Sequence, residues 1–162
     1  MAVFFLILLL TGTFYGAGRL GVGAARNLRD SARVGTALAF ILVGATHFLT
    51  PDKYMELMPP FVPAPALMIY LSGFFEILGG VGLLVAATRK AAAFGLAALL
   101  LAVFPANVYV ALNNVQLGGF MNYSFYQWLR LPMQFALIGW VLWTVEIIGP
   151  RNTRTERKNK QR

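Results

Sequence analysis

Long apolar runs, separated by short polar or basic connections, account for most of the chain. A helix that rises about 1.5 Å per residue needs about 20 residues to cross the hydrocarbon core of a bilayer. The pattern therefore predicts an all-α integral membrane bundle of five transmembrane helices. Their predicted ranges are 1–18, 34–49, 66–87, 91–112 and 129–148.

Prolines and short connections set the predicted ends of these helices. The second run is slightly short, so its helix needs to start near Ser31, with Arg33 reaching toward the headgroups. Residues 50–65 contain five prolines, which lack N–H groups and fix φ, so this connection is predicted to be a stiff, extended external loop. Only residues 88–90 separate the third and fourth runs, which predicts an antiparallel hairpin.

The outer ends of the last two helices are expected to carry a kink and an aromatic belt. Pro105 is predicted to kink the fourth helix. Residues 113–127 are predicted to form an external loop whose tyrosines, with nearby Trp128, suit the membrane interface. The Gly-Pro pair at 149–150 is predicted to end the fifth helix.

Basic residues are concentrated at alternate connections. Twelve of the 14 lie in three clusters, within residues 19–33, at residues 89–90 and within residues 151–162. Cytoplasmic connections are enriched in Lys and Arg, so the N-terminus is expected outside and the C-terminus in the cytoplasm. Residues 1–150 then form a single transmembrane domain, followed by a basic tail that is expected to be disordered, to bind anionic lipid and to pair with Glu146. Clustering at connections rather than along one face argues against nucleic acid binding.

The composition indicates lipid as the solvent and removes several kinds of chemistry. Hydrophobic residues make up 58% of the 162 residues and charged residues only 12%, whereas a soluble domain carries about 25% charged residues. The chain has no cysteine and one histidine, which excludes thiolate-ligated metals and iron–sulfur centres and argues against a multi-histidine metal site. No covalent cofactor is expected, and a redox role needs a bound organic cofactor or a partner chain.

Small residues in two of the runs are typical of close helix packing in membranes. Gly12 and Gly16 form a G-x-x-x-G pattern in the first run, and the third run carries glycines at positions 73, 79, 80 and 82. These patterns leave open whether the contacts lie within the bundle or between the subunits of a homo-oligomer.

One acidic residue lies deep in a predicted span. Glu76 is about ten residues into the third helix, where a carboxylate costs about 2.5 to 3.5 kcal/mol even on permissive insertion scales. Ser72, Glu76 and Gly80 follow one another at intervals of four residues and therefore share a helix face. That face is expected to point into the bundle rather than at lipid.

Four further polar residues fall in the outer half of the predicted bundle: His47, Asn107, Arg130 and Gln134. Two interpretations of this cluster stay open, and they are compatible. The first is a structural network in which Glu76 is protonated or satisfied by Arg130, Asn107 or His47. The second is a pocket whose apolar walls hold a hydrophobic ligand while the polar groups orient its head.

Several short motifs between residues 33 and 143 resemble the DoxX-like family of small bacterial membrane proteins. They are His47-Phe48, Met58-Pro59-Pro60 with Pro63, Leu71-Ser72-Gly73, Glu76-Ile77-Leu78-Gly79-Gly80, Val103-Phe104-Pro105-Ala106-Asn107, and Trp128-Leu129-Arg130 with Pro132 and Gln134. The resemblance implies a four-helix core, with residues 1–18 as an extra N-terminal helix, in the bacterial inner membrane. It also implies a link to quinone reduction, because relatives occur in membrane oxidoreductase complexes or as assembly factors.

The leading hypothesis is a pocket, open to the outer leaflet, that binds a quinone or another lipophilic molecule as part of a membrane oxidoreductase complex. Its expected lining residues are His47, Ser72, Glu76, Asn107, Arg130 and Gln134. Glu76 would exchange protons or orient the head, with Arg130 as its counter-charge. One alternative is an assembly or chaperone-like membrane protein that acts through helix packing. Another is a stand-alone intramembrane acid–base enzyme that uses Glu76 and His47 on a lipid.

Overall fold

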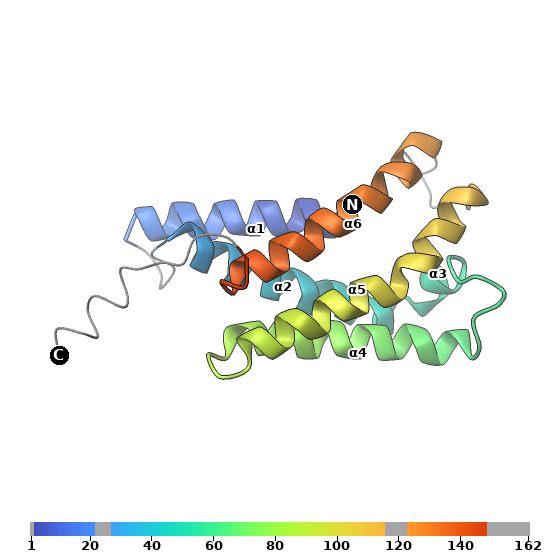
Figure 1. Cartoon of the computed structure of the whole chain (residues 1–162), viewed down its shortest axis with the longest axis horizontal. Helices are drawn as coiled ribbons and strands as arrows, with labels where there is room; N and C mark the ends of the chain where they lie inside the picture. The colour runs from blue at the N-terminus through green and yellow to red at the C-terminus, as the bar shows by residue number, and fades with distance from the viewer. Residues whose placement is uncertain (1, 22–26, 116–122, 149–162) are drawn as a thin grey trace.

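The computed structural model describes residues 2–21, 27–115 and 123–148, and the regular secondary structure in these ranges is entirely helical. In the described ranges, five long helices run along an elongated bundle, and one short helix lies at its end (Figure 1). The helices are α1 (Ala2–Arg19), α2 (Leu28–Leu49), α3 (Pro51–Met55), α4 (Pro65–Leu84), α5 (Arg89–Leu112) and α6 (Ser124–Thr144).

Three of the described helices are long and apolar enough to cross a membrane, by length and composition: α2, α4 and α5. The helix of residues 2–19 is also apolar but shorter. Three of the five predicted spans therefore have the properties of membrane-crossing helices, as expected for a membrane protein.

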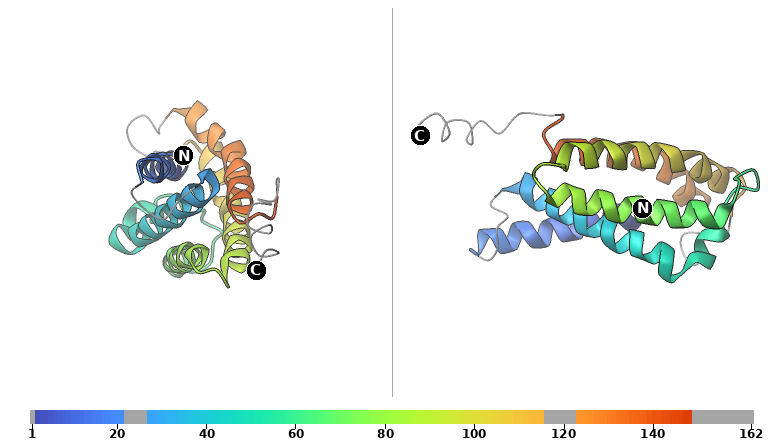
Figure 2. Two further views of the ribbon diagram at one scale, coloured as in Figure 1. Left: turned by 90° about the vertical axis from the view of Figure 1, so that its left-hand side faces the viewer. Right: turned by 90° about the horizontal axis from the view of Figure 1, so that it is seen from below.

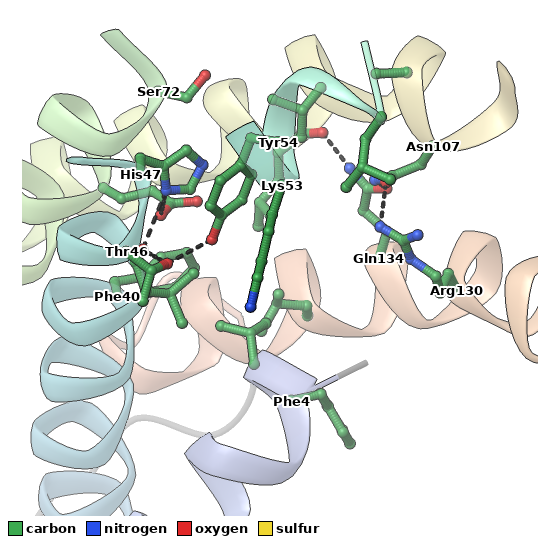
Figure 3. A pocket seen from close by; sticks show the side chains of 18 of the residues that line it. Phe4, Phe40, Thr46, His47, Lys53, Tyr54, Ser72, Asn107, Arg130 and Gln134 are labelled. Atoms are coloured by element: carbon green, nitrogen blue, oxygen red, sulfur yellow. Dashed lines mark hydrogen bonds and ion pairs between the residues drawn. The ribbon is translucent and has the colours of Figure 1, made fainter. Parts of the chain in front are cut away.

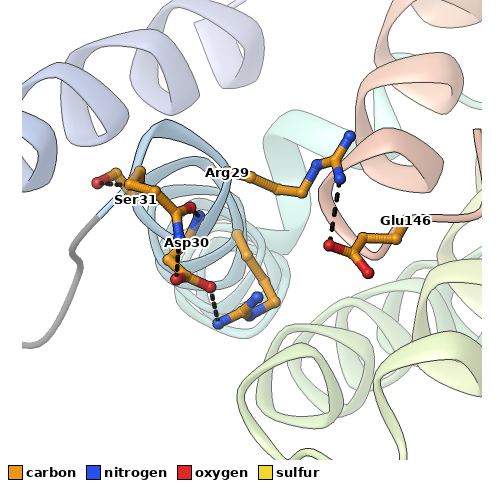
Figure 4. Close-up of polar contacts among 6 residues, drawn as sticks. Arg29, Asp30, Ser31 and Glu146 are labelled. Atoms are coloured by element: carbon orange, nitrogen blue, oxygen red, sulfur yellow. Dashed lines mark hydrogen bonds and ion pairs between the residues drawn. The ribbon is translucent and has the colours of Figure 1, made fainter. Parts of the chain in front are cut away.

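The start of α2 explains how its short apolar run becomes a full-length helix. Asn27 caps the helix, because its side-chain oxygen accepts a hydrogen bond from the backbone N–H of Asp30 at 2.8 Å. Asp30 in turn pairs with Arg33 at 2.7 Å, within the first two turns (Figure 4). The helix thus begins at Leu28, ahead of the predicted start near Ser31.

The prediction that residues 50–65 form an extended loop is wrong in part. Pro51 is the first residue of α3, and Pro65 is the first residue of α4. A proline is well tolerated at this position, because the N–H group that it lacks has no intrahelical partner there. Residues 56–64 between the two helices form a connection that contains turns and bends. The prolines therefore start helices here instead of preventing them.

The boundaries of α6 also differ from the prediction. The helix begins at Ser124, so the last part of the predicted external loop 113–127 is helical, and it ends at Thr144. Val145 caps it, and Glu146 has a φ of 63°. The predicted stop at residues 149–150 and the basic tail lie outside the described residues. Within them, Glu146 pairs with Arg29 at 3.2 Å, which joins the end of α6 to the start of α2 (Figure 4).

The predicted hairpin and the proline in the fourth span are present. Helices α4 and α5 are joined by residues 85–88 and run antiparallel. Pro105 lies inside α5, whose ribbon changes direction toward its C-terminal end (Figure 1).

Helix α2 is the centre of the bundle and packs against both α1 and α4 (Figure 2). A Cβ added at Gly44 would lie 2.7 Å from the carbonyl oxygen of Gly73, and one added at Gly80 would lie 2.7 Å from that of Ala37. Gly73 and Gly80 are seven residues apart, as are Gly44 and Ala37. The backbones of α2 and α4 therefore touch along two helical turns, which only small residues allow.

The two glycine patterns have different environments. The α4 glycines at positions 73, 79, 80 and 82 pack tightly against α2 or α5. Gly12 and Gly16 of α1 are exposed, and an added Cβ would meet nothing within 4 Å among the described atoms. Helix α1 instead contacts α2 through its opposite side, where Ile7 and Thr11 are buried.

Candidate functional site

A cavity of about 1030 Å³ lies at the end of the bundle where α2 ends, away from the Arg29–Glu146 pair. We call it the α3 cavity, because α3 lies beside it and Tyr54 and Lys53 of α3 line it (Figure 3). All six helices contribute to its lining. The structure brings together every residue that the sequence singled out as a ligand contact: His47, Ser72, Glu76, Asn107, Arg130 and Gln134.

The contact between α2 and α4 positions one side of this cavity. A Cβ added at Gly73 would lie 2.6 Å from the Cβ of His47 and 2.7 Å from the carbonyl oxygen of Gly44. Because the two backbones approach so closely, His47 and Glu76 face each other across the helix pair. The distance from His47 Nδ1 to Glu76 Oε2 is 3.6 Å.

Glu76 is incompletely satisfied by the protein. Its Oε2 atom is buried and has no hydrogen-bond partner among the described residues. The 3.6 Å separation from His47 Nδ1 is slightly beyond hydrogen-bond distance. The same Nδ1 atom lies 3.1 Å from the carbonyl oxygen of Val43. Since buried polar atoms normally have partners, Glu76 has the capacity for one more contact in the cavity.

Besides His47 and Glu76, a second set of polar side chains lies on α5 and α6. The Nη2 atom of Arg130 donates to Asn107 Oδ1 at 2.8 Å, and Asn107 Nδ2 donates to Gln134 Oε1 at 2.8 Å. Gln134 Nε2 then donates to the carbonyl oxygen of Leu100. Arg130 and Gln134 are one turn apart on α6, so both side chains reach the same helix of the hairpin.

The expected pairing of Arg130 with Glu76 is not present among the described ion pairs. Arg130 donates to Asn107, and Glu76 faces His47 instead. Each residue is held by a neighbour on an adjoining helix: α2 packs on α4, and α5 packs on α6. Ser72 donates to the carbonyl oxygen of Met68 in its own helix at 2.8 Å. The polar residues thus form two separate groups around one cavity.

Tyr54 is a part of the site that the sequence did not reveal. Its ring stacks on His47 with centroids 3.9 Å apart, and its hydroxyl group is hydrogen-bonded to Thr46 (Figure 3). Burial raises the pKa of the Tyr54 phenol, the Thr46 hydrogen bond opposes this, and the charge of Glu76 adds to it. The phenol is therefore protonated at neutral pH. The available signal was Pro51, because a proline often marks the first turn of a helix.

Lys53 is the second residue that the sequence did not single out. It lies on α3 beside Tyr54, and Figure 3 shows its ammonium group pointing into the α3 cavity, toward the end of α1 that carries Phe4. The opposite part of the lining is apolar. It includes Phe40 of α2, Leu100 of α5 and Leu137 of α6. The cavity therefore combines an apolar wall with a polar and charged end.

No group of three or more His, Cys, Asp or Glu residues in the described ranges is placed to hold a metal ion. The polar groups of the cavity are instead hydrogen-bond donors and acceptors and charged side chains.

Residues 36–145 match the model of a protein family described as a domain of unknown function, DUF8561. The match covers more than half of the chain, so the protein belongs to this family. It includes most of α2 and all of α3 to α6, and it leaves α1 outside. No curated protein and no solved structure matches the chain. The resemblance to the DoxX-like family stays a prediction from its motifs.

Proposed function

We propose that this member of the DUF8561 family spans the membrane five times and binds a lipophilic small molecule, a quinone or another lipid-soluble compound, in the α3 cavity. The observation that carries the proposal is the cavity itself, with an apolar wall on one side and the polar groups of Glu76 and Arg130 on the other. Binding sites for small molecules commonly combine mostly apolar walls with a few well-placed polar groups.

The topology of the proposal follows from helix packing and charge. Helices α1 and α6 pack along α2 and α5, so they share the bilayer with the three helices of clearest spanning character. Arg29, Arg33 and Arg89 start α2 and α5 at one end of the bundle. The positive-inside rule assigns that end to the cytoplasm. The α3 cavity then lies in the outer half of a bacterial inner membrane.

The chemistry of the cavity suits a ligand with a polar head and an apolar body. Arg130 retains N–H groups beyond the one that it donates to Asn107, and these can donate to a ligand oxygen. The unpartnered Oε2 of Glu76 can accept a hydrogen bond or a proton from the head. Phe40, Leu100 and Leu137 offer an apolar surface for the body.

Native mass spectrometry of the gently extracted protein tests the proposal, together with titration of decylubiquinone and of uncharged lipids. We expect a bound small molecule or measurable affinity in the wild type. Glu76→Gln and Arg130→Ala should each weaken binding about tenfold or more, because a hydrogen bond to a charged group is worth about 1.5 to 3 kcal/mol.

Glu146→Gln is the matched control for Glu76→Gln, because it makes the same chemical change at the opposite end of the bundle. It should leave ligand binding unchanged. The proposal fails if the Glu76 and Arg130 variants fold normally and bind the quinone and lipid panel as the wild type does.

A second candidate function, assembly with another membrane protein, is favoured by the exposed face of α1. Gly12 and Gly16 meet no other part of the described chain, yet this pattern normally supports close contact between helices. A membrane partner, such as a subunit of an oxidoreductase complex, or a second copy of the chain would use that face.

Co-purification and cross-linking in membranes test this second candidate. Gly16→Leu should abolish the association and leave ligand binding intact. Gly95→Leu is the control, because Gly95 also faces open space but belongs to α5. If both variants associate as strongly as the wild type does, the proposed interface on α1 is contradicted.

A further inference from the structure

The carboxyl group of Glu76 lacks a hydrogen bond that its burial calls for. Its side chain is 16% exposed, and its buried Oε2 atom has no hydrogen-bond partner among the described residues. His47 Nδ1 lies 3.6 Å from this atom, slightly beyond hydrogen-bond distance. A buried carboxyl group without a partner is costly, whether it is ionised or protonated. Because Glu76 lines the α3 cavity, a molecule in the cavity can supply the missing contact.

The ring of His47, beside Glu76, has one nitrogen left for such a molecule. Its Nδ1 atom lies 3.1 Å from the carbonyl oxygen of Val43. A carbonyl oxygen can only accept, so Nδ1 carries the hydrogen of this bond. In the neutral imidazole the lone pair is then on Nε2, and in the imidazolium Nε2 carries a second N–H group. His47 lines the cavity, so we assign Nε2 to the contact with a ligand.

Three hydroxyl groups of the cavity lining use their protons within the protein. Thr46 donates to a carbonyl oxygen of its own helix, and the hydroxyl group of Tyr54 therefore donates to Thr46. Ser72 also donates to a carbonyl oxygen of its own helix, at 2.8 Å. None of these three protons is left for Glu76. The contact that Glu76 lacks therefore has to come from the contents of the cavity.

Neither sign of charge predominates among the described side chains of the lining. The charged residues there are Lys53, Glu56, Glu76 and Arg130, two of each sign. Lys53 and Glu56 are exposed, so water and salt screen their charges. Glu76 and Arg130 are of opposite sign. The lining therefore does not call for a charged head, and removing such a head from water is costly.

A hydroxyl group suits Glu76 and His47 together. It donates to a carboxylate or to the lone pair of a neutral imidazole, and it accepts from a carboxylic acid or an imidazolium. It therefore fits the two side chains in each of their protonation states. The oxygen of a ketone, an ester or an ether can only accept, so it fits only the protonated forms. The carbonyl oxygens of a quinone have the same restriction.

We infer that the ligand is an uncharged lipid whose head bears a free hydroxyl group, such as a long-chain alcohol or a monoacylglycerol. This inference rests on the proposed binding function and narrows its ligand class. The hydroxyl group bonds Glu76 and His47. A second oxygen, in a head that has one, accepts from Arg130, which Figure 3 shows across the cavity from His47. The aliphatic chain lies against Phe40 and Leu100.

The experiment is a binding titration of the full-length protein in phosphatidylcholine nanodiscs, read by native mass spectrometry. Oleyl alcohol and its methyl ether form the central pair of probes, because they share one chain and differ at the hydroxyl group. The alcohol should bind at least about tenfold more tightly, since a site built around a hydroxyl group leaves polar groups unpaired when that group is absent. Monoolein should likewise bind more tightly than decylubiquinone. Oleate should bind no more tightly than oleyl alcohol.

Two carboxyl-removing variants link this preference to Glu76. Glu76→Leu should abolish the preference for the alcohol over its ether, because it removes the group that the hydroxyl bonds. Glu56→Leu is the matched control, since it makes the same change at an exposed residue of the same lining, and it should retain the preference. Thermal unfolding of each variant checks that it folds. The comparison of the two probes on the wild type does not depend on any variant.

Arg130→Ala tests the second head contact. It should weaken the binding of monoolein about tenfold, because the ester or a second hydroxyl oxygen loses its charged donor. It should leave the ratio of affinities for oleyl alcohol and its ether unchanged, because these probes have a single oxygen, which Glu76 and His47 bind. A fall of this ratio to that of Glu76→Leu would contradict the assignment of the hydroxyl group to Glu76 and His47.

The outcomes separate this inference from the function on which it rests. Equal affinity of the wild type for oleyl alcohol and its ether overturns the hydroxyl-bearing class and leaves lipophilic binding in place. Tighter binding of oleate than of oleyl alcohol overturns the uncharged class. An unchanged preference in Glu76→Leu overturns the role of Glu76. If no lipophilic probe binds to the wild type, the proposed function fails together with this inference.

Discussion

Asn107 connects the polar side chains on α5 and α6. It accepts a hydrogen bond from Arg130 and donates one to Gln134, which in turn donates to the carbonyl oxygen of Leu100. A side-chain amide can do both, because it carries an acceptor oxygen and two N–H donors. The direction in which the Arg130 guanidinium points into the α3 cavity therefore depends on a neutral neighbour rather than on a counter-ion.

Asn107→Leu removes both of these contacts while keeping a side chain of similar volume. We expect the free energy of unfolding to fall by about 1 to 3 kcal/mol, because Arg130 and Gln134 lose buried partners. Reversible unfolding in mixed micelles measures the change. Asn113→Leu is the control, since Asn113 is exposed and, among the described residues, its side chain bonds the Tyr109 carbonyl of its own helix. Equal stability of the two variants would contradict the linking role.

The location of the polar residues could be predicted from the sequence, but their pairing could not. A carboxylate deep in the membrane is costly, so the predicted depth of Glu76 is enough to predict that it lies beside other polar residues. Which residues meet depends on the order of the helices around the bundle, and this order cannot be inferred from the sequence. The sequence therefore leaves Arg130, Asn107 and His47 open as partners of Glu76, and the ligand-binding hypothesis favours Arg130, whereas His47 is the residue that the α2–α4 contact brings there.

At the scale of elements, backbone contact between α2 and α4 aligns one wall of the α3 cavity. Gly44 and Gly73 let the helices touch, and His47 and Glu76 lie directly beside this contact. Any side chain at either glycine has to push the helices apart. The glycine spacing predicted close packing, and the partner helix became apparent only in the structure.

Gly73→Ala should separate α2 from α4 at this point. The new Cβ would lie 2.6 Å from the His47 Cβ, so we expect a loss of roughly 1 to 3 kcal/mol in unfolding free energy from overpacking. Gly95→Ala is the control, since its Cβ would meet nothing within 4 Å. It should be neutral or stabilise α5 by up to about 1 kcal/mol through helix propensity. If thermal unfolding shows that Gly73→Ala is more stable than Gly95→Ala, this packing is contradicted.

Proline content alone gives the wrong prediction for α3. Five prolines between residues 50 and 65 indicated an extended loop, but two of them occupy first helical positions, Pro51 in α3 and Pro65 in α4. Composition counts prolines without their position, whereas the physical restriction applies mainly to helix interiors. For this reason Lys53 and Tyr54, which α3 brings to the cavity, were not among the predicted site residues.

At the scale of the whole molecule, the boundary of the family match and the boundary of the fold differ. The match begins at residue 36 and excludes α1. Even so, Ile7 is 0% exposed and belongs to the main apolar core with Phe40 and Val141. The sequence resemblance had also indicated residues 1–18 as an addition. In this chain α1 is packed into the core, and its first turn lines the α3 cavity through Phe4.

Ile7→Ala tests whether α1 is an integral part of the stable fold. We expect a loss of roughly 2 to 4 kcal/mol in unfolding free energy, because the change leaves a hole against α2. Leu9→Ala is the control on the same helix, where Leu9 is 67% exposed. The measurement is the free energy of unfolding of both variants, taken from a cooperative unfolding transition. If the two variants are equally stable, α1 is only loosely attached.

Helix α1 starts partway along the bundle (Figure 1), where the ring of Phe4 lies 6.5 Å from that of Trp140 of α6, and Val3 and Phe4 belong to the cavity lining. Under the proposed topology, a molecule approaching past this first turn arrives sideways, from the acyl chains of the outer leaflet. Occupancy then follows the mole fraction of ligand in the bilayer and not its aqueous concentration. Diluting the protein with added lipid at constant total ligand should lower occupancy, whereas diluting the vesicles with buffer should leave it nearly constant.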